Sequence, residues 1–199
     1  MMPEGGIGVV LLAAGRGTRF GPEPKLLERL DGKPLVRHAA EAAFGSDLRP
    51  IVVVLGANAA PVRASLADLD PTFVENPRYA EGLSTSLRIG LEALPGTVTA
   101  AVVMLGDMPR IAGHHLDRLA SAFRAAPDVA AIVPVSGGRR GNPVLLNRGR
   151  LGAELAALVG DRGAGSLLAA RRDVVEIAMD AAVGQDVDTR EALAGLRQA

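Results

Sequence analysis

Three short runs of the sequence are apolar at every position, and they constrain the fold more than any other feature. They span residues 7–12, 51–55 and 100–105, and each stops at a glycine or a small-residue turn. A strand with one face in water alternates apolar and polar residues, whereas a strand buried on both faces is apolar throughout. The three runs therefore predict central strands of a parallel sheet that is covered on both sides.

Segments with helical character separate these runs. Pro34 precedes and Gly45 follows the segment 35–44, as is usual for the two ends of a helix. Alternating strands and helices are typical of an α/β fold with a mostly parallel sheet. No linker, repeat or low-complexity stretch divides the chain, so we expect one domain over 1–199. Further strands are expected at 130–135, 143–146 and 174–178, and helices at 35–44, 59–67, 84–94, 116–125, 153–159, 166–171 and 190–196, the last of them capped by Asp188 or Thr189.

Composition excludes several classes of function. The 22 lysines and arginines balance 22 aspartates and glutamates, so the formal net charge is zero and a basic surface for nucleic acid is not expected. The absence of cysteine removes thiol nucleophiles, disulfides and Cys-ligated metal sites. No apolar run approaches the roughly 20 residues of a membrane span, and the first residues lack the positive charge of a secretory signal. We expect a cytoplasmic protein without membrane or nucleic-acid partners.

A glycine-rich loop follows the first predicted strand. Residues 13–25 read AAGRGTRFGPEPK, so small residues that let backbone N–H groups approach an anion are followed by the cations Arg19 and Lys25. A Walker A loop would need lysine where Pro22 stands, and a dinucleotide-binding fingerprint would need a third glycine where Phe20 stands. The loop is predicted to bind phosphate in another manner; the simpler alternative is a turn that uses glycine only for its positive φ.

Asp107 directly follows the third apolar run. In open α/β sheets, ligands bind outside the carboxyl ends of the strands, so its carboxylate is expected near the glycine-rich loop. Mg²⁺ is usually held by one or two carboxylates together with substrate phosphates. Asp107 is therefore a candidate magnesium ligand; the alternative is an aspartate that only caps the turn before Pro109.

Hydroxyl and acidic residues mark two predicted helix starts. Ser84, Thr85 and Ser86 open one helix, and its free N–H groups could bind an anion or the edge of a base. Capping by Ser84 alone explains the same residues. Asp161, in the segment GDRGAG, is likewise a plausible helix cap.

The three histidines are not expected to form a metal site. His114 and His115 are neighbours in the sequence, and adjacent residues do not face each other on a helix. His38, in a predicted helix, fits a packing or surface position.

Six segments together resemble one family. They are LAAGRGTRFG followed by PK, NPRYAEGLSTSL (76–87), LGDMP (105–109), RRGNPVLL (139–146), GDRGAGSLL (160–168) and DVDTREAL (186–193). In this order they resemble the nucleotidylyltransferases with a MobA-like NTP-transferase domain, and most of all the molybdenum cofactor cytidylyltransferases (MocA-like). The resemblance implies a three-layer, Rossmann-like nucleotidyltransferase fold of the glycosyltransferase A-like kind, with a mostly parallel, mixed sheet.

The resemblance also implies an activity: Mg²⁺-dependent transfer of a cytidylyl group from CTP to the phosphate of molybdopterin, with release of pyrophosphate. The apo-form of a molybdenum hydroxylase is then a further partner. Ala14 favours CTP, because the form LAAG accompanies cytidylyl members and LAGG accompanies guanylyl members. Taken with the loop and Asp107, the resemblance predicts catalytic roles for Arg19 and Lys25, nucleotide contacts for Leu12, Ala13, Ala14, Gly15, Arg16, Gly17, Lys25, Asn76, Gly82 and Ser84, metal ligation by Asp107 with Asp188 or Asp186, and acceptor contacts for Arg140, Asn142 and Asp161.

Three alternatives stay open. Relatives of this kind transfer nucleotides to other phosphorylated acceptors, and a few are described as NAD(P)H-dependent oxidoreductases. The run 51–55 ends in Leu55-Gly56-Ala57 without the acidic residue that would hold a ribose, which disfavours the oxidoreductase. The third alternative is a non-catalytic chaperone that binds molybdenum cofactor and hands it to an enzyme.

Overall fold

A mixed β-sheet forms the centre of the computed structural model, which describes residues 5–197. The strand order is β10-β7-β9-β6-β1-β4-β5, with β8 paired to β7. Only β9 and β8 run antiparallel to their neighbours; the pairs among the other strands are parallel. The strands are β1 (Gly6–Ala13), β4 (Ile51–Leu55), β5 (Thr72–Glu75), β6 (Val98–Leu105), β7 (Ala131–Ser136), β8 (Arg139–Arg140), β9 (Val144–Asn147) and β10 (Val174–Ala178).

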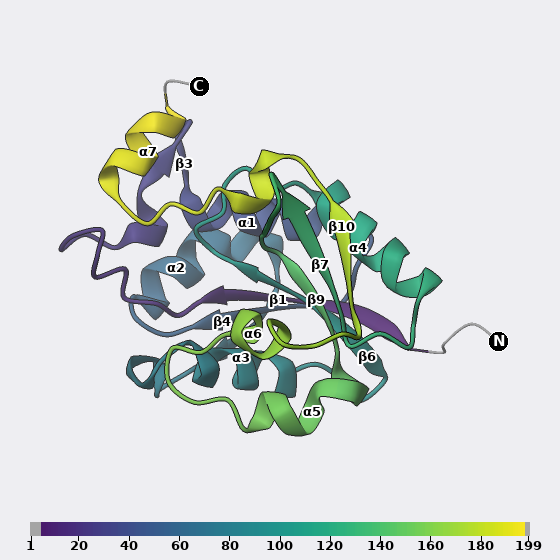
Figure 1. Ribbon diagram of the computed structural model, residues 1–199. Helices are drawn as coiled ribbons and strands as arrows, with labels where there is room; N and C mark the ends of the chain where they lie inside the picture. Colours follow the sequence, from purple (N-terminus) through teal and green to yellow (C-terminus); the bar gives the residue numbers. More distant parts are fainter. Residues whose placement is uncertain (1–4, 198–199) are drawn as a thin grey trace.

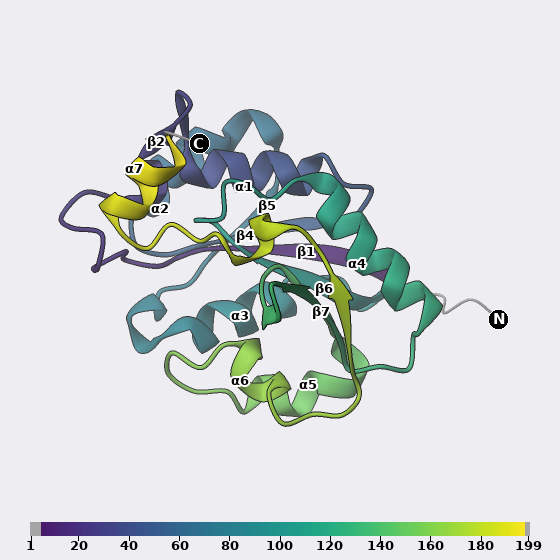
Figure 2. The same ribbon diagram turned by 45° about the horizontal axis from the view of Figure 1, so that its top comes forward.

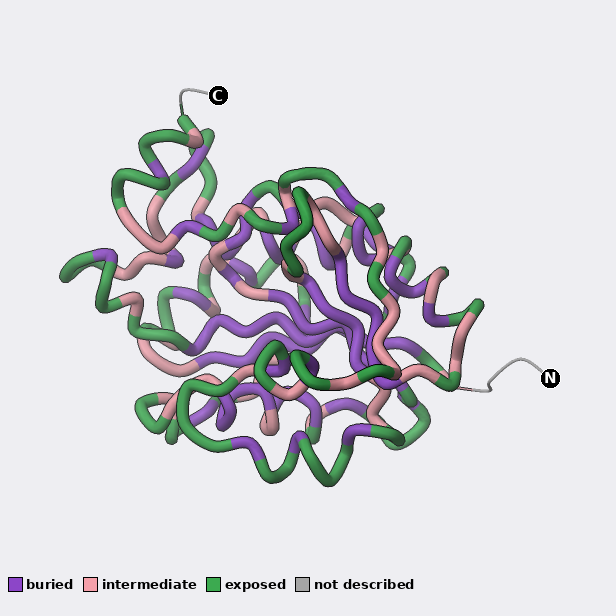
Figure 3. Tube along the Cα trace, viewed as in Figure 1, coloured by how far each residue is buried: buried purple, intermediate pink, exposed green. Residues whose placement is uncertain are grey.

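Helices cover both faces of this sheet (Figures 1 and 2). One layer consists of α1 (Leu35–Phe44), α2 (Ala59–Leu66) and α4 (Gly113–Ala125), and the other of α3 (Leu83–Glu92), α5 (Arg148–Ala156) and α6 (Ala164–Leu168). Along β1, Val9 and Leu11 enter the first hydrophobic cluster, whereas Val10 and Leu12 enter the second. The strand is therefore apolar throughout because it feeds two cores, as Figure 3 shows for the buried centre of the molecule. The predicted three-layer α/β fold is confirmed.

A small third cluster lies beside the main sheet. The hairpin of β2 (Arg29–Leu30) and β3 (Lys33–Pro34) packs there near α7 (Arg190–Leu196), as Figure 1 shows. Its buried side chains are Phe20, Leu30, Leu35, Val187 and Leu193. The cluster connects the glycine-rich loop to the C-terminal segment, so two distant parts of the chain are held together near the same edge of the sheet.

Several predicted elements match the structure to the residue. Helices 35–44 and 190–196 and strands 51–55 and 174–178 have the predicted bounds. The strand expected at 143–146 exists as β9 but runs antiparallel to β6 and β7. The edge strand β5, whose residues TFVE are only partly buried, was not predicted, because it lacks the continuous apolar run of the central strands.

Four helix starts differ from expectation, and one of them is α4, which begins at Gly113 rather than at 116. Helix α5 begins at Arg148 rather than at 153, because the Asn147 side chain caps it by accepting the Arg150 N–H. Ser84 and Asp161 do not cap their helices: Gly82 precedes α3 and Gly163 precedes α6. Of the two candidates for α7, Thr189 is the cap, since its hydroxyl accepts the Ala192 N–H. None of the helices within residues 5–197 is long and apolar enough to cross a bilayer.

The contact between α3 and the sheet gives a first prediction. A Cβ on Gly90 would lie 2.4 Å from Val10 Cγ1 and 2.8 Å from Val54 Cγ2, whereas a Cβ on Gly152 in α5 would meet nothing within 4 Å. Overpacking a core typically costs about 1–3 kcal/mol, and replacing a helical glycine with alanine gains up to about 1 kcal/mol. We expect Gly90→Ala to lower the free energy of unfolding in urea and Gly152→Ala to raise it. Equal stabilisation by the two substitutions would contradict the close contact between α3 and β1.

Candidate active site

The glycine-rich loop lies at the edge where the parallel strands end. The register pairs Leu12 of β1 with Leu105 of β6, and the Gly106 N–H donates to the Leu12 carbonyl at 3.0 Å. The loop after β1 and the residues after β6 are therefore neighbours. Gly17 has a φ of +63°, and a Cβ there would lie 2.7 Å from Lys25 Cβ, so glycine lets the two ends of the loop approach each other.

The start of the loop presents backbone donors. Among the hydrogen bonds of residues 5–197, the amides of Gly15, Arg16 and Gly17 have no acceptor in the protein, while the Phe20 N–H closes the turn onto the Gly17 carbonyl. Successive outward N–H groups form a concave anion-binding surface. This arrangement is what the prediction of a phosphate-binding loop requires.

A cavity of about 460 Å³ opens in front of this loop. It lies at the carboxyl edge of the sheet, where open α/β folds bind their ligands. Several predicted site residues meet there, including Lys25, Asp107, Asp188 and Gly82. The complete lining comprises Leu12, Ala14, Gly15, Arg16, Gly17, Thr18, Arg19, Lys25, Leu26, Tyr79, Ala80, Gly82, Leu83, Ser86, Leu105, Gly106, Asp107, Asp161, Asp186 and Asp188.

Lys25 lies between two of the acidic side chains of this cavity. Its Nζ donates to Asp107 Oδ2 at 2.6 Å and to Asp188 Oδ1 at 3.3 Å. The other oxygen of Asp188 pairs with Arg19 at 2.8 Å. The Lys25 and Asp107 side chains are only 12% and 14% exposed, whereas Arg19 is 76% exposed. The structure therefore brings both predicted cations and two predicted metal ligands together, with Lys25 inside and Arg19 at the mouth.

Asp107 combines a buried charge with an unused oxygen. Burial raises the pKa of its carboxyl above the ordinary value, and Lys25 opposes that shift while the negative charge of Asp186 adds to it. Its Oδ1 is buried and has no hydrogen-bond partner among the described residues. A buried carboxylate oxygen of this kind is costly unless a cation or donor reaches it, and Asp186 and Asp188 line the same cavity. The donors fit a divalent cation held by one or two carboxylates and completed by substrate oxygens.

The start of α3 forms the opposite wall. A Cβ on Gly82, whose φ is +116°, would lie 2.2 Å from the Gly160 backbone carbon, so the two loops touch there. The Ser84 hydroxyl is buried without a hydrogen-bond partner in the described part of the chain, and Ser86 lines the cavity. Asn76 is buried behind this wall, where its amide donates to Thr85 and Ser86 at 2.8 and 2.9 Å. Its contacts hold the wall in place.

Tyr79 is a cavity residue that the sequence reasoning missed. It is the single tyrosine of the chain, it lines the cavity, and the Arg16 guanidinium lies 5.5 Å from its ring centroid. The available signal was a lone aromatic residue in the segment NPRYAEG, just before the predicted helix start at Ser84. A ring at this position offers a face on which a base can stack.

A smaller cavity of about 210 Å³ adjoins the first and shares Leu12, Leu83 and Leu105 with it. Arg140 and Asn142, two of the predicted acceptor contacts, line it, and most of its other walls are aliphatic. Arg140 is held in place, because it donates to Glu176 at 2.7 Å and to the Leu168 carbonyl at 2.9 Å. The third predicted acceptor contact, Asp161, lies in the larger cavity with the glycine-rich loop instead.

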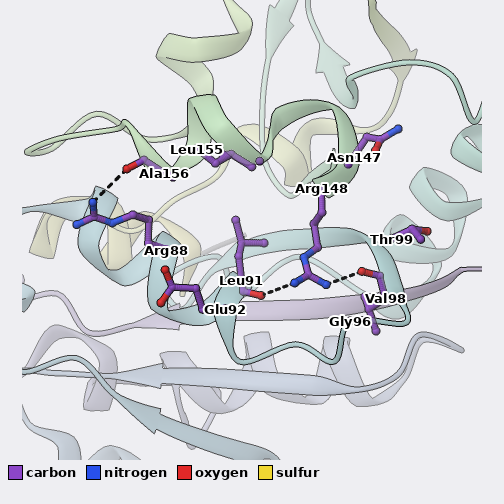
Figure 4. A pocket seen from close by; sticks show the side chains of 12 residues that line it. Arg88, Leu91, Glu92, Gly96, Val98, Thr99, Asn147, Arg148, Leu155 and Ala156 are labelled. Carbon is purple, nitrogen blue, oxygen red and sulfur yellow. Dashed lines mark hydrogen bonds between the residues drawn. The ribbon is translucent and has the colours of Figure 1, made fainter.

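A further cavity of about 510 Å³ lies between α3 and α5, near the start of β6 (Figure 4). It is therefore at the opposite end of β6 from Asp107. Arg148 crosses it and donates to backbone carbonyls at the end of α3 and the start of β6, among them Leu91 at 3.0 Å. Since helix ends leave carbonyls without intrahelical partners, these contacts give Arg148 a structural role.

Comparisons with known proteins agree with this geometry. Residues 9–175 match the family model described as "MobA-like NTP transferase domain". Nicotine blue oxidoreductase of Paenarthrobacter nicotinovorans is 34% identical over 194 residues, which cover 92% of each protein. The crystal structure of Rv0371c from Mycobacterium tuberculosis H37Rv is similar with a TM-score of 0.86 and 30% identity, over 98% of this chain and 100% of that one.

Two other structures bear on the metal and the fold. The complex of Rv0371c with manganese has a TM-score of 0.81 and 31% identity, over 98% of this chain and 99% of that one. A nucleotidyl transferase from Methanothermobacter, 22% identical, shares the fold with a TM-score of 0.81 over 96% of each chain. Because the family model covers most of the chain and includes the glycine-rich loop and Asp107, the protein belongs to the family with a MobA-like NTP transferase domain.

Proposed function

We propose that this protein is a divalent-metal-dependent nucleotidylyltransferase that takes CTP as nucleotide and molybdopterin as acceptor. The observation that carries the transferase activity is the buried Lys25–Asp107 pair, with its unused carboxylate oxygen, facing the amides of the glycine-rich loop. CTP and molybdopterin rest on the resemblance, including Ala14 in the LAAG form. The manganese complex of the similar Rv0371c supports a divalent cation.

The proposed reaction is an in-line displacement at phosphorus. An oxygen of the acceptor phosphate forms a bond to the α-phosphorus of CTP, and the bond from that phosphorus to the oxygen bridging the β-phosphate breaks, so that pyrophosphate leaves. Such chemistry requires positioning and charge neutralisation rather than covalent participation by the protein. A Mg²⁺ ion held by Asp107 with Asp186 or Asp188 would supply a Lewis acid for the phosphate oxygens.

Groups at different places in the cavity would contribute to this reaction in different ways. The amides of Gly15, Arg16 and Gly17 orient the phosphates, and Lys25 neutralises charge from a fixed, half-enclosed place. Arg19 reaches in from the exposed side. The aliphatic cavity beside Arg140 and Asn142 receives the acceptor, since it joins the nucleotide cavity through shared walls.

The name of a similar protein favours a second candidate, an oxidoreductase. Nicotine blue oxidoreductase shares 34% identity with nearly the whole chain, and a nicotinamide nucleotide would place phosphates on the same loop. The cavity lining contains no acidic residue from the turn after β4, where a ribose would need one. A chaperone that only carries molybdenum cofactor is the third alternative.

Ligand-dependent melting distinguishes these functions. With Mg²⁺ present, we expect CTP to raise the melting temperature more than GTP, ATP or UTP, and NADPH to have no effect. A ligand at a hundred times its Kd stabilises the folded state by about 2.7 kcal/mol. A shift with NADPH and with none of the nucleoside triphosphates would establish the oxidoreductase instead, and stabilisation by molybdopterin without pyrophosphate release on adding CTP would favour the chaperone.

Asp107→Asn tests the metal ligand. We expect pyrophosphate release to fall at least about 10²-fold, the scale on which losing one charge-stabilising group acts. The melting temperature should hardly change, because asparagine has the same shape and relieves a buried charge. Asp128→Asn, which alters a 97% exposed carboxylate, serves as the control. An active Asp107→Asn enzyme would remove the metal role from this residue.

Lys25→Met tests the buried pair, since methionine keeps the unbranched stem and loses the charge. Without the ammonium group, the pKa of Asp107 rises further above its unfolded value, so the folded state retains a proton that the unfolded state releases. At low pH the variant should therefore be nearly as stable as the wild type. Its stability should fall as the pH rises from the pKa of Asp107 in the unfolded state to the higher pKa in the folded state. In urea unfolding we expect a loss on the order of 3 kcal/mol at neutral pH, the scale for breaking a buried pair.

Two variants control this experiment. In the double variant Lys25→Met/Asp107→Asn, the uncompensated carboxylate is absent and the pH-dependent loss should disappear. Lys33→Met breaks an exposed pair with Glu41 and should cost less than about 1 kcal/mol. A loss for Lys25→Met that is the same at low and neutral pH would contradict the burial of Asp107.

A further inference from the structure

Two neighbouring histidines meet an aspartate outside the lining of the nucleotide cavity. His114 and His115 lie in the first turn of α4, and Asp180 precedes the short 3₁₀ helix η4 (Ala181–Gly184). The ring centroids of the histidines are 4.0 Å apart with 33° between the ring planes. The expectation that these side chains diverge is therefore wrong. The rule for adjacent residues describes the interior of a helix, whereas the His115 ring folds back onto the residue that precedes α4.

His115 is fixed at both ring nitrogens. Its Nδ1 lies 3.0 Å from the Ala112 nitrogen and 3.2 Å from the Ala112 carbonyl oxygen, so it accepts from the one or donates to the other according to the tautomer. Its Nε2 lies 3.2 Å from each carboxylate oxygen of Asp180. The side chain is 3% exposed, while that of Asp180 is 62% exposed. A buried imidazole with a defined orientation is thus aimed at an anion on a different element.

The donor atoms have metal-site spacing. One ring nitrogen from each histidine and one Asp180 oxygen all lie within 4.8 Å of one another. Zinc bonds to histidine and carboxylate ligands are about 2.0–2.2 Å long, so tetrahedral ligand atoms are about 3.3 Å apart, close to the 3.2 Å between His115 Nε2 and Asp180. The ligand nitrogen of the exposed His114 ring lies within 4.8 Å of the other two ligand atoms and would move closer to them on binding a metal.

The backbone around His115 can support ligation. Metal-bound histidine almost always donates its other N–H to a carbonyl or carboxylate. In the tautomer with the proton on Nδ1, the Ala112 carbonyl accepts it and the Nε2 lone pair is available to a metal; in the other tautomer, Nε2 donates to Asp180. Asp180 is suited to the anionic position, because its carboxylate lies 3.2 Å from Nε2 and is oriented by the Ala182 N–H, which donates to Oδ1 at 3.0 Å.

We propose that His114, His115 and Asp180 form a second, zinc-type metal site, with water as the fourth ligand. Two imidazoles and one carboxylate suit zinc and neighbouring transition metals rather than Mg²⁺. The site is separate from the Asp107 cavity, whose lining contains none of these three residues.

Its position indicates a structural role. Asp180 begins the segment that leads to Asp186 and Asp188, and that segment is tied to the sheet by hydrogen bonds from Met179 to Val135 and from Asn142 to Val183. A metal bound at Asp180 would fasten the start of this segment to α4, stabilising the folded protein.

Metal binding to the tag-free protein tests the proposal. After removal of metal with a chelator, Co²⁺ is titrated and followed by its visible absorption, and Zn²⁺ binding is measured by equilibrium dialysis. We expect one Zn²⁺ per chain at this site, and at least about a 10-fold loss of affinity in His114→Ala and in Asp180→Asn. Zn²⁺ should also raise the melting temperature of the wild type but not of these variants. Both residues are exposed, so neither variant should fail to fold; circular dichroism checks this.

Two controls separate this site from other binding. His38→Gln removes the third histidine of the chain, and Asp107→Asn removes the buried carboxylate of the nucleotide cavity; both should retain Zn²⁺ and the Co²⁺ spectrum. Unchanged Zn²⁺ affinity in His114→Ala and Asp180→Asn would overturn the proposal, as would loss of Zn²⁺ in Asp107→Asn. No step of this experiment depends on nucleotide transfer.

Discussion

The pairing of β1 with β6 is the constraint on which the site depends. Because Leu12 lies opposite Leu105, the chain leaves the sheet at the same level on two neighbouring strands. The glycine-rich loop and Asp107 therefore emerge side by side, although they are far apart in the sequence. Burial of both faces of β1 fixes this register, since a slip of one residue would exchange the side chains of its two hydrophobic clusters.

Charge balance is the second organising feature. Asp107 is buried at the strand end, and within residues 5–197 its one ion pair is with Lys25, at the far end of the loop. Gly17 allows the loop to bend back far enough for this contact. The same lysine reaches Asp188 on the C-terminal segment, so one ammonium group connects three parts of the chain. A phosphate or a divalent cation that enters this cavity would change the balance of charges around Lys25 and so affect all three segments.

The sequence predicted the layers and the location of the site well, because both follow from local patterns. Unbroken apolar runs such as 51–55 indicate strands with two buried faces, and ligands bind where those strands end. It could not predict that β9 runs antiparallel, since a run such as VLLN has the same pattern in either direction. Caps were also uncertain: Ser84 and Thr189 are both good capping residues, but only the loop geometry around Thr189 directs its hydroxyl to a helical N–H.

The contacts of individual side chains could not be predicted from local patterns either. The phosphate contact expected of Lys25 stays a prediction, and its observed contact with Asp107, 82 residues away, has no local signal in the sequence. Asn76 was assigned to the nucleotide, but two hydroxyls of α3 occupy its amide. The histidine pair was dismissed by a rule about helix interiors that does not hold at a helix start. Each of these contacts is long-range or lies at the start of a helix, where neighbouring residues in the sequence give little information.

The reversed direction of β9 has a consequence for how such a protein can change. Since β9 is antiparallel to β6, it begins at the edge where β6 ends, and the turn before it, with Arg140 and Asn142, lies beside the smaller cavity. The glycine-rich loop and the segment before β9 thus belong to different connections of the sheet, which meet at its carboxyl edge. Substitutions before β9 can alter the shape of the smaller cavity without disturbing the core pairs of β1, so the two cavities can change independently of each other.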